Sequence, residues 1–204
     1  MKQISQLLSA IFSPLLVPTY GIILGLWATL LVLAPVNTRI HVAIITCCIT
    51  AVIPAIGIFV LYRLGVIGST GLNDRTDRTV PYIITGVAYL ACMFYLIRAN
   101  APSWLWLFIA GGFAATVVSA VINRWWKISA HMAAMGGLMA ITFIIWTTPL
   151  AMPGVGMMIW FAATVFATGA VGTARVYLGR HTLAQVLAGT ANGFLCVWIA
   201  SLFA

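Results

Sequence analysis

The chain has 204 residues, of which 63% are hydrophobic and only 6% are charged, and its mean hydropathy is +1.12. So few polar residues cannot cover a water-soluble globule, and the composition therefore predicts an integral, multi-pass membrane protein. The net charge of +8 does not indicate a nucleic-acid partner, because the basic residues are scattered between apolar runs. The runs have the length of membrane-spanning helices, and the alternating segments of a membrane barrel are absent. We expect an all-α, polytopic membrane helix bundle that forms a single domain over residues 1–204.

The apolar runs follow a short interfacial segment at residues 1–10. The first run continues too far to be the core of a secretory signal, so we interpret it as a retained span. Pairs of glycines four residues apart in the first and last runs predict close helix packing, namely Gly21 with Gly25 and Gly189 with Gly193. The span count before residue 123 stays open, so six to seven membrane helices are expected. As counted along the chain, the expected spans cover residues 11–34, 40–62, 82–97, 102–122, 130–147, 155–171 and 182–203.

Three polar junctions separate pairs of these spans, at residues 63–81, 123–131 and 174–185. Because two spans lie between successive junctions, all three should emerge on the same side of the membrane. The first junction holds both carboxylates of the chain and the arginines Arg75 and Arg78. Residues three apart share a face if the segment is helical, so we interpret both arginines as phosphate ligands. The alternative is an ordinary solvated loop.

The third junction contains residues that are typical of a helix end followed by a helix start. Gly179 predicts a helix end, and Thr182 with Gln185 three residues later predicts a capping box at the next helix start. His181 therefore lies at a helix N-terminus, where free backbone N–H groups and the helix dipole attract anions. This position predicts an anion site.

The second junction repeats the arrangement. Ser129 is the expected N-cap of the following span, which places His131 in the first turn of that helix. Two histidines at helix starts on one membrane face are suited to covalent and acid–base catalysis. The alternative is that Arg175 and Arg180 only extend to the membrane interface and that His181 is an incidental polar residue.

These residues carry a resemblance to a known family. Arg175, His181 and Gln185 have the spacing of the motif SRxxxxxHxxxD, and Ile128-Ser129-Ala130-His131 is similar to the motif PSGH. Both belong to the type 2 phosphatidic acid phosphatase superfamily, and the resemblance covers the two junctions with their flanking spans.

The resemblance implies a membrane phosphatase that needs no metal and no cofactor. His181 would attack phosphorus to form a phosphohistidine, and His131 would protonate the leaving oxygen and then activate water. Arg175, Lys127 and the Ser129 region would hold the phosphate oxygens, as arginine forks match such groups. The implied substrate is a lipid phosphate or polyprenyl diphosphate.

The chain departs from the family pattern at three places. Ala174 replaces the serine of the third motif, and Gln185 replaces its aspartate. The carbonyl of Gln185 can still hold His181, so reduced rather than abolished activity is expected, although Gln185 could be a capping residue only. The family's first motif, KxxxxxxRP, is not reproduced, because Pro81 follows Val80.

Two other functions stay open. Residues 73–77, Asn-Asp-Arg-Thr-Asp, resemble the start of the NDxxDxxxD motif of membrane aromatic prenyltransferases, but that magnesium chemistry needs more carboxylates than the two present. A non-catalytic lipid-phosphate binding or transport protein would explain Ala174 and Gln185. However, a transporter site would lie near the middle of the membrane, whereas these basic residues gather at one face.

Overall fold

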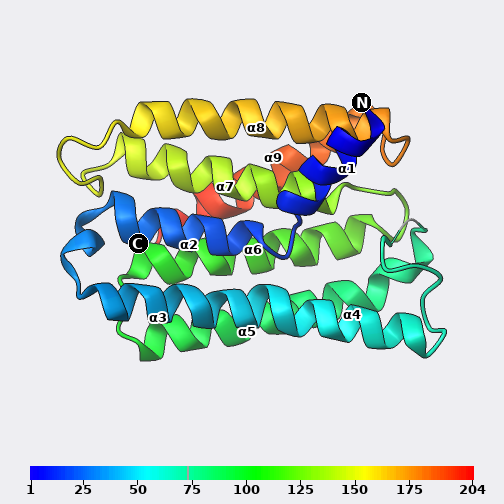
Figure 1. Ribbon diagram of the computed structural model, residues 1–204, viewed down its shortest axis with the longest axis horizontal. Helices are drawn as coiled ribbons and strands as arrows, with labels where there is room; N and C mark the ends of the chain where they lie inside the picture. The colour runs from blue at the N-terminus through cyan, green and yellow to red at the C-terminus, as the bar shows by residue number, and fades with distance from the viewer. Residues whose placement is uncertain (73) are drawn as a thin grey trace.

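The computed structural model describes residues 1–72 and 74–204, so Asn73, the first residue of the prenyltransferase-like sequence, lies outside the described residues. The described chain folds into helices that run side by side between two ends of an elongated bundle (Figure 1). Within the described residues, six stretches are long and apolar enough to cross a membrane, which favours a multi-pass membrane protein. The elements are α1 (Lys2–Ile11), α2 (Val17–Ala28), η1 (Leu30–Leu33), α3 (Val36–Cys47), η2 (Cys48–Val52), α4 (Ile53–Arg63), η3 (Thr76–Arg78), α5 (Thr79–Arg98), α6 (Ser103–Ile122), α7 (Ala130–Thr147), α8 (Met157–Tyr177) and α9 (Leu183–Ser201).

The expected span at residues 11–34 is divided in the structure. Helix α2 has only 12 residues, about 18 Å at 1.5 Å per residue, which is too short to cross the hydrocarbon core alone. The chain breaks before it around Ser13, because the residue before a proline disfavours helical geometry. At the other end Thr29 is extended, and its hydroxyl donates to the carbonyl of Gly25 at 2.6 Å. The part of the chain that the structure describes thus has six candidate spans and one shorter apolar helix, which agrees with the predicted six to seven membrane helices.

The expected second span is longer than predicted and continuous. Helices α3 and α4 are joined by the single π-helical turn η2, so together they form one stretch from Val36 to Arg63. In Figure 1 this stretch runs the length of the bundle beside α5.

Helices α7 and α9 have the closest packing in the bundle. A Cβ atom on Gly189 would lie 2.6 Å from the carbonyl oxygen of Ser129, and one on Gly193 would overlap the carbonyl of Ala133. Only glycine allows the two backbones to approach this closely, which confirms the predicted packing role of this pair. The contact also brings the start of α9 beside the start of α7, and both catalytic candidates lie at these starts.

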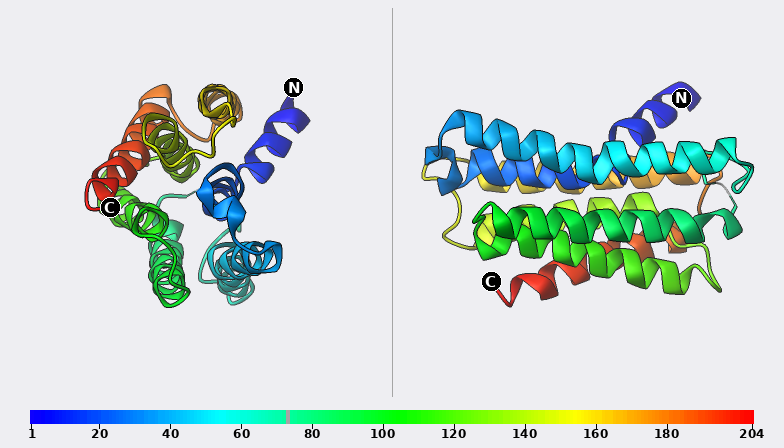
Figure 2. Two further views of the ribbon diagram at one scale, coloured as in Figure 1. Left: turned by 90° about the vertical axis from the view of Figure 1, so that its left-hand side faces the viewer. Right: turned by 90° about the horizontal axis from the view of Figure 1, so that it is seen from below.

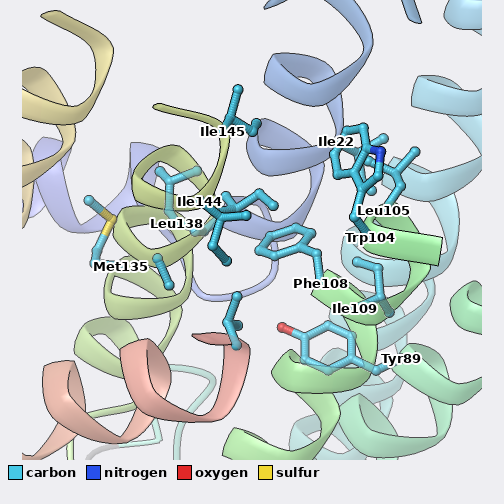
Figure 3. Packing of buried hydrophobic residues seen from close by; sticks show 14 of the residues in the cluster. Ile22, Tyr89, Trp104, Leu105, Phe108, Ile109, Met135, Leu138, Ile144 and Ile145 are labelled. Carbon is cyan, nitrogen blue, oxygen red and sulfur yellow. The ribbon is translucent and has the colours of Figure 1, made fainter. Parts of the chain in front are cut away.

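The centre of the bundle is apolar and the outer surface is apolar as well. Figure 3 shows Phe108 of α6 projecting towards Ile144 and Leu138 of α7, with Tyr89 of α5 beneath it. On the outside, large side chains such as Phe166 are 80% exposed. An exposed apolar surface of this kind marks contact with a membrane or a partner.

Candidate active site

The three polar junctions meet at one end of the bundle, the right-hand end in Figure 1. The guanidinium of Arg78, in the first junction, donates from Nη1 to the carbonyl of Ile128 in the second at 2.9 Å. The backbone N–H of Ser129 donates to the carbonyl of Gln185 in the third at 3.4 Å. Residues about fifty positions apart are thereby joined, as the parity of the spans predicts.

The end of α8 shows why the third junction turns where it does. Gly179 has a φ of +65°, the left-handed conformation expected of a helix-ending glycine. The N–H of Arg180 donates to the carbonyl of Arg175 at 3.1 Å, and that of Gly179 donates to the carbonyl of Val176 at 2.9 Å. This is the Schellman pattern, and it confirms the predicted helix end. It leaves His181 between the end of α8 and the start of α9.

Gln185 holds the ring of His181 and caps α9 with the same atom. Its Oε1 lies 3.0 Å from Nδ1 of His181 and also accepts from the backbone N–H of Thr182 at 3.2 Å. Since a backbone N–H can only donate, the capping box fixes the amide with its oxygen facing these two groups. Nδ1 of His181 must therefore carry the hydrogen, and Nε2 keeps its lone pair. Both roles considered for Gln185, capping and orienting, are present together.

His181 is only 7% exposed, and its surroundings disfavour a positive charge. Burial lowers its pKa to about 4, and the nearby cations Arg78, Arg175 and Lys127 act in the same direction, while the hydrogen bond that His181 donates to Gln185 opposes them. The imidazole is therefore neutral at pH 7, which is the form of a nucleophile.

His131 lies in the first turn of α7 and contacts the N-terminal helix. Its Nε2 is 3.1 Å from the carbonyl oxygen of Ser9, in α1. Because a carbonyl only accepts, Nε2 carries the hydrogen and Nδ1 has a free lone pair. The position of His131 at a helix start is as predicted.

Ser129 occupies the N-cap position of α7, but its hydroxyl does not cap the helix. The side chain is fully buried, and Oγ has no hydrogen-bond partner in the described part of the chain. A capping role for this hydroxyl is therefore wrong, and a buried donor remains beside the two histidine-bearing helix starts.

Two arginines are buried in the same region. Arg78 is 6% exposed and Arg175 is 8% exposed. Arg78 donates to the backbone carbonyls of Leu72 and Ile128, both at 2.9 Å, and Nε of Arg175 has no partner among the described residues. Lys127 is half-buried, and burial together with the nearby arginines lowers its pKa. Two buried guanidinium groups and a half-buried ammonium group leave this end of the bundle positive.

Arg75 lies elsewhere. It is exposed, its Nη1 donates to the carbonyl of Arg124 at 2.6 Å, and it lines a separate shallow pocket with Arg124, Asn123, Thr76 and Thr79. The structure does not bring it to the histidines, because Arg75 precedes the helical turn that buries Arg78. Its role as a phosphate ligand stays a prediction.

The carboxylates of the first junction are exposed or partly exposed. Oδ2 of Asp77 accepts from the N–H of Gly68 at 2.8 Å, which closes the loop after α4. Among residues 1–72 and 74–204, no three His, Cys, Asp or Glu side chains lie together as metal ligands would.

A cavity of about 350 Å³ connects the histidines with the interior of the bundle. Its polar lining includes Arg78, His131, Arg175 and His181. It continues between α5, α6, α7 and α9, where it is lined by apolar residues that include Tyr89, Phe108, Ile109, Ala134 and Val197. The cavity therefore joins a cationic end to an apolar interior.

Comparison with known proteins bears on the half of the site that α7, α8 and α9 supply. The family model of the PAP2 superfamily matches residues 123–204. This part of the chain is similar to the PAP2 superfamily. The match supports a phosphatase-type activity on phosphate esters, and it includes both site histidines, Ser129, Arg175 and Gln185. No curated protein and no solved structure matches the chain.

Two contributions come from outside the matched residues. Arg78 enters from the first junction, and Ser9 enters from α1, which the sequence analysis treated only as an interfacial segment. The signal that could have pointed to α1 is the pair Ser5 and Ser9, four residues apart and so on one face of an otherwise mostly apolar helix.

Proposed function

We propose that this protein is a metal-independent phosphatase of the membrane that hydrolyses a lipid phosphate or polyprenyl diphosphate through a phosphohistidine. The observation that carries the proposal is the cavity in which His181, held at Nδ1 by Gln185, lies with His131 and two buried arginines. Residues 1–204 would act as one membrane domain with its active site at the three junctions.

In the first step, the lone pair on Nε2 of His181 attacks phosphorus as the bond to the leaving oxygen breaks. His131, as the imidazolium, gives its Nδ1 proton to that oxygen. The negative charge of the incoming phosphate favours this protonated form, since an opposite charge nearby stabilises the charged state. An alcohol, or a phosphate monoester from a diphosphate, then leaves.

In the second step, neutral His131 takes a proton from water at Nδ1 while the water oxygen attacks phosphorus. The phosphorus–nitrogen bond breaks, phosphate is released, and His181 returns to its neutral form held by Gln185. Gln185 supports both steps because it keeps the hydrogen on Nδ1, so that Nε2 always faces the reacting atom.

The cations stabilise the charge that develops on the phosphate oxygens. Arg78 and Arg175 are already desolvated by the protein, and two backbone carbonyls hold Arg78 in place, so little reorganisation is needed when the phosphate binds. Ser129 supplies a hydroxyl that has no hydrogen-bond partner among the described residues, and Lys127 lies near the buried arginines. Preorganised positive charge is the main requirement of phosphoryl transfer.

The lipid substrate is inferred from the rest of the cavity. A water-soluble phosphate ester would not need the apolar lining between α5, α6, α7 and α9, whereas an acyl or prenyl chain would bury its surface there. The headgroup would lie at the membrane face and the chain inside the bundle.

The test is phosphate release by the purified protein from lipid phosphates and polyprenyl diphosphates with EDTA present. We expect release by the parent, loss in His181→Ala, and an acid-labile phosphoenzyme that is missing in that variant. His41→Ala is the matched control, because His41 belongs to α3 and does not line the cavity. A strict magnesium requirement would instead support the prenyltransferase.

A non-catalytic binding protein remains the second candidate, favoured by Ala174 and Gln185 at two motif positions. It predicts that the parent binds lipid phosphate and releases no phosphate at any pH between 4 and 9.

A further inference from the structure

Helix α1 places its polar residues inwards and its apolar residues outwards. Ser5 and Ser9 are each 8% exposed, while Ile4 and Leu7 are 61% and 60% exposed. The helix packs against α8 near the end of the bundle that holds the site, at an angle to the other helices (Figure 2). The exposed apolar face suits the membrane interface, but it does not explain why two serines are buried.

Ser9 contacts the site through its backbone. Its carbonyl accepts the hydrogen bond from Nε2 of His131 at 3.1 Å, so α1 sets which ring nitrogen of His131 carries the hydrogen. The interaction joins residues 122 positions apart.

The hydroxyl of Ser9 is buried and has no hydrogen-bond partner in the described part of the chain. A serine within a helix usually bonds to the carbonyl one turn earlier, and a buried hydroxyl without any partner is destabilising. Ser9 also lines the cavity that contains Arg78, Arg175 and His181. The hydroxyl is thus a buried donor that lines the same cavity as two cations that attract an anion, Arg78 and Arg175, and the candidate nucleophile His181.

We propose that Ser9 binds the substrate: its hydroxyl donates a hydrogen bond to a non-bridging oxygen of the phosphate, while its carbonyl orients His131. This inference rests on the proposed function, and it makes α1 a part of the active site although α1 lies outside the family-matched residues. The hydroxyl supplies a neutral donor on the α1 side of the cavity, where the adjacent lining residue Ala10 offers none.

The substitution Ser9→Ala removes the hydroxyl and keeps the carbonyl, so the contact with His131 is preserved. Ser5→Ala is the matched control, because Ser5 is equally buried on the same face of α1 and does not line the cavity. Binding of inorganic phosphate to the full-length protein in detergent is measured by calorimetry, and KM and kcat are measured with a lipid phosphate. We expect Ser9→Ala to weaken phosphate binding by about tenfold or more, the effect of losing one hydrogen bond to a charged group, and Ser5→Ala to change it by less than about twofold.

The pair Ser9→Thr and Ser9→Val separates the hydroxyl from packing, because the two side chains have nearly the same shape. Retained phosphate affinity in Ser9→Thr with loss in Ser9→Val supports the proposal. Equal affinities in the two variants, or parental affinity in Ser9→Ala, would overturn it.

The two proposals fail in different ways. A parent that binds phosphate through Ser9 and releases none from lipids would retain this inference and refute the phosphatase. If the parent hydrolyses lipid phosphate and Ser9→Ala is equally active and binds phosphate equally well, the phosphatase is retained and the role of Ser9 is refuted. A parent that neither binds inorganic phosphate nor hydrolyses lipid phosphate would refute both.

Discussion

Replacing Gln185 tests whether this neutral partner sets the tautomer and the pKa of His181. Gln185→Glu keeps the length of the side chain, so an oxygen can still accept from Thr182 and from Nδ1 of His181, and it adds one negative charge. Gln185→Met keeps the approximate size and removes both hydrogen bonds. The two variants therefore change the charge and the hydrogen bonds separately.

The size of the expected pKa change follows from the distance between the side chains of residues 185 and 181. With Nδ1 and Oε1 3.0 Å apart, the two charge centres would lie roughly 4 Å apart, where unit charges interact by about 4 kcal/mol at an effective dielectric constant of ~20. That equals about three pH units, and the desolvation of the new carboxylate offsets part of it, so we expect the pKa of His181 to rise by at least about one unit. In Gln185→Met the ring can adopt the other tautomer, a fault that costs roughly 10⁴ in rate in the serine protease triad.

The assay is single-turnover phosphate release against pH. In the parent the acid limb of kcat/KM should lie near pH 4, the pKa of His181. In Gln185→Glu the limb moves upwards and the rate at pH 7.5 rises, by up to about tenfold if the charged hydrogen bond is worth ~1.4 kcal/mol more. Gln185→Met loses roughly 10² or more in rate and about 1 kcal/mol of stability from the lost cap. An unchanged acid limb in Gln185→Glu, or a near-parental rate in Gln185→Met, would refute the role of Gln185 in orienting His181. Gln3→Glu is the control for the added negative charge, because Gln3 is exposed on α1.

Three further predictions concern charge, position and packing. The pKa of His181 falls from 6.5 to about 4 on folding, so between pH 4 and pH 6.5 the unfolded chain binds more protons than the folded chain. The free energy of unfolding should therefore be highest above pH 6.5 and decrease by roughly 3 kcal/mol as the pH is lowered to 4. Thermal unfolding measured against pH tests this. Arg78→Gln should raise KM for lipid phosphate by at least about tenfold, while Arg75→Gln stays within about threefold, since only the first lines the cavity; equal effects would contradict the arrangement. Gly193→Ala should destabilise the protein by about 1–3 kcal/mol in chemical unfolding, because the added methyl group overlaps the carbonyl of Ala133; an unchanged unfolding midpoint would show that α7 and α9 can separate freely.

The parts of the site that sequence could predict are those fixed by local chemistry. Gly179, Thr182 and Gln185 act within a few residues of one another, so the helix end, the helix start and the place of His181 between them follow from known capping patterns. The common side of the three junctions also follows, because it depends only on the number of spans between them. The all-helical bundle is predicted by composition and run length alone.

The parts that sequence could not predict depend on contacts between distant residues. Nothing near Ser9 indicates that its carbonyl meets His131, and nothing near Arg75 or Arg78 tells which of the two turns inwards. The divided first span was missed for a related reason: hydropathy over residues 11–34 is continuous, whereas the break depends on the backbone around Pro14. The hydroxyl of Ser129 was assigned to capping because the pattern allowed it, and only the structure shows it without a partner.

The charge balance of the site explains why these distant pieces have to converge. Arg78 and Arg175 are both buried. Arg78 donates to two backbone carbonyls, and Nε of Arg175 has no hydrogen-bond partner among the described residues, so the burial of these charges is costly. The same cations push protons away from His181 and Lys127. An anion in the cavity relieves all of these costs at once, because it pairs with the arginines and accepts from Ser9 and Ser129 while Nε2 of His181 faces it. Binding of an anion therefore stabilises the site, and the desolvated cations stabilise the transferring phosphate more strongly as its charge develops.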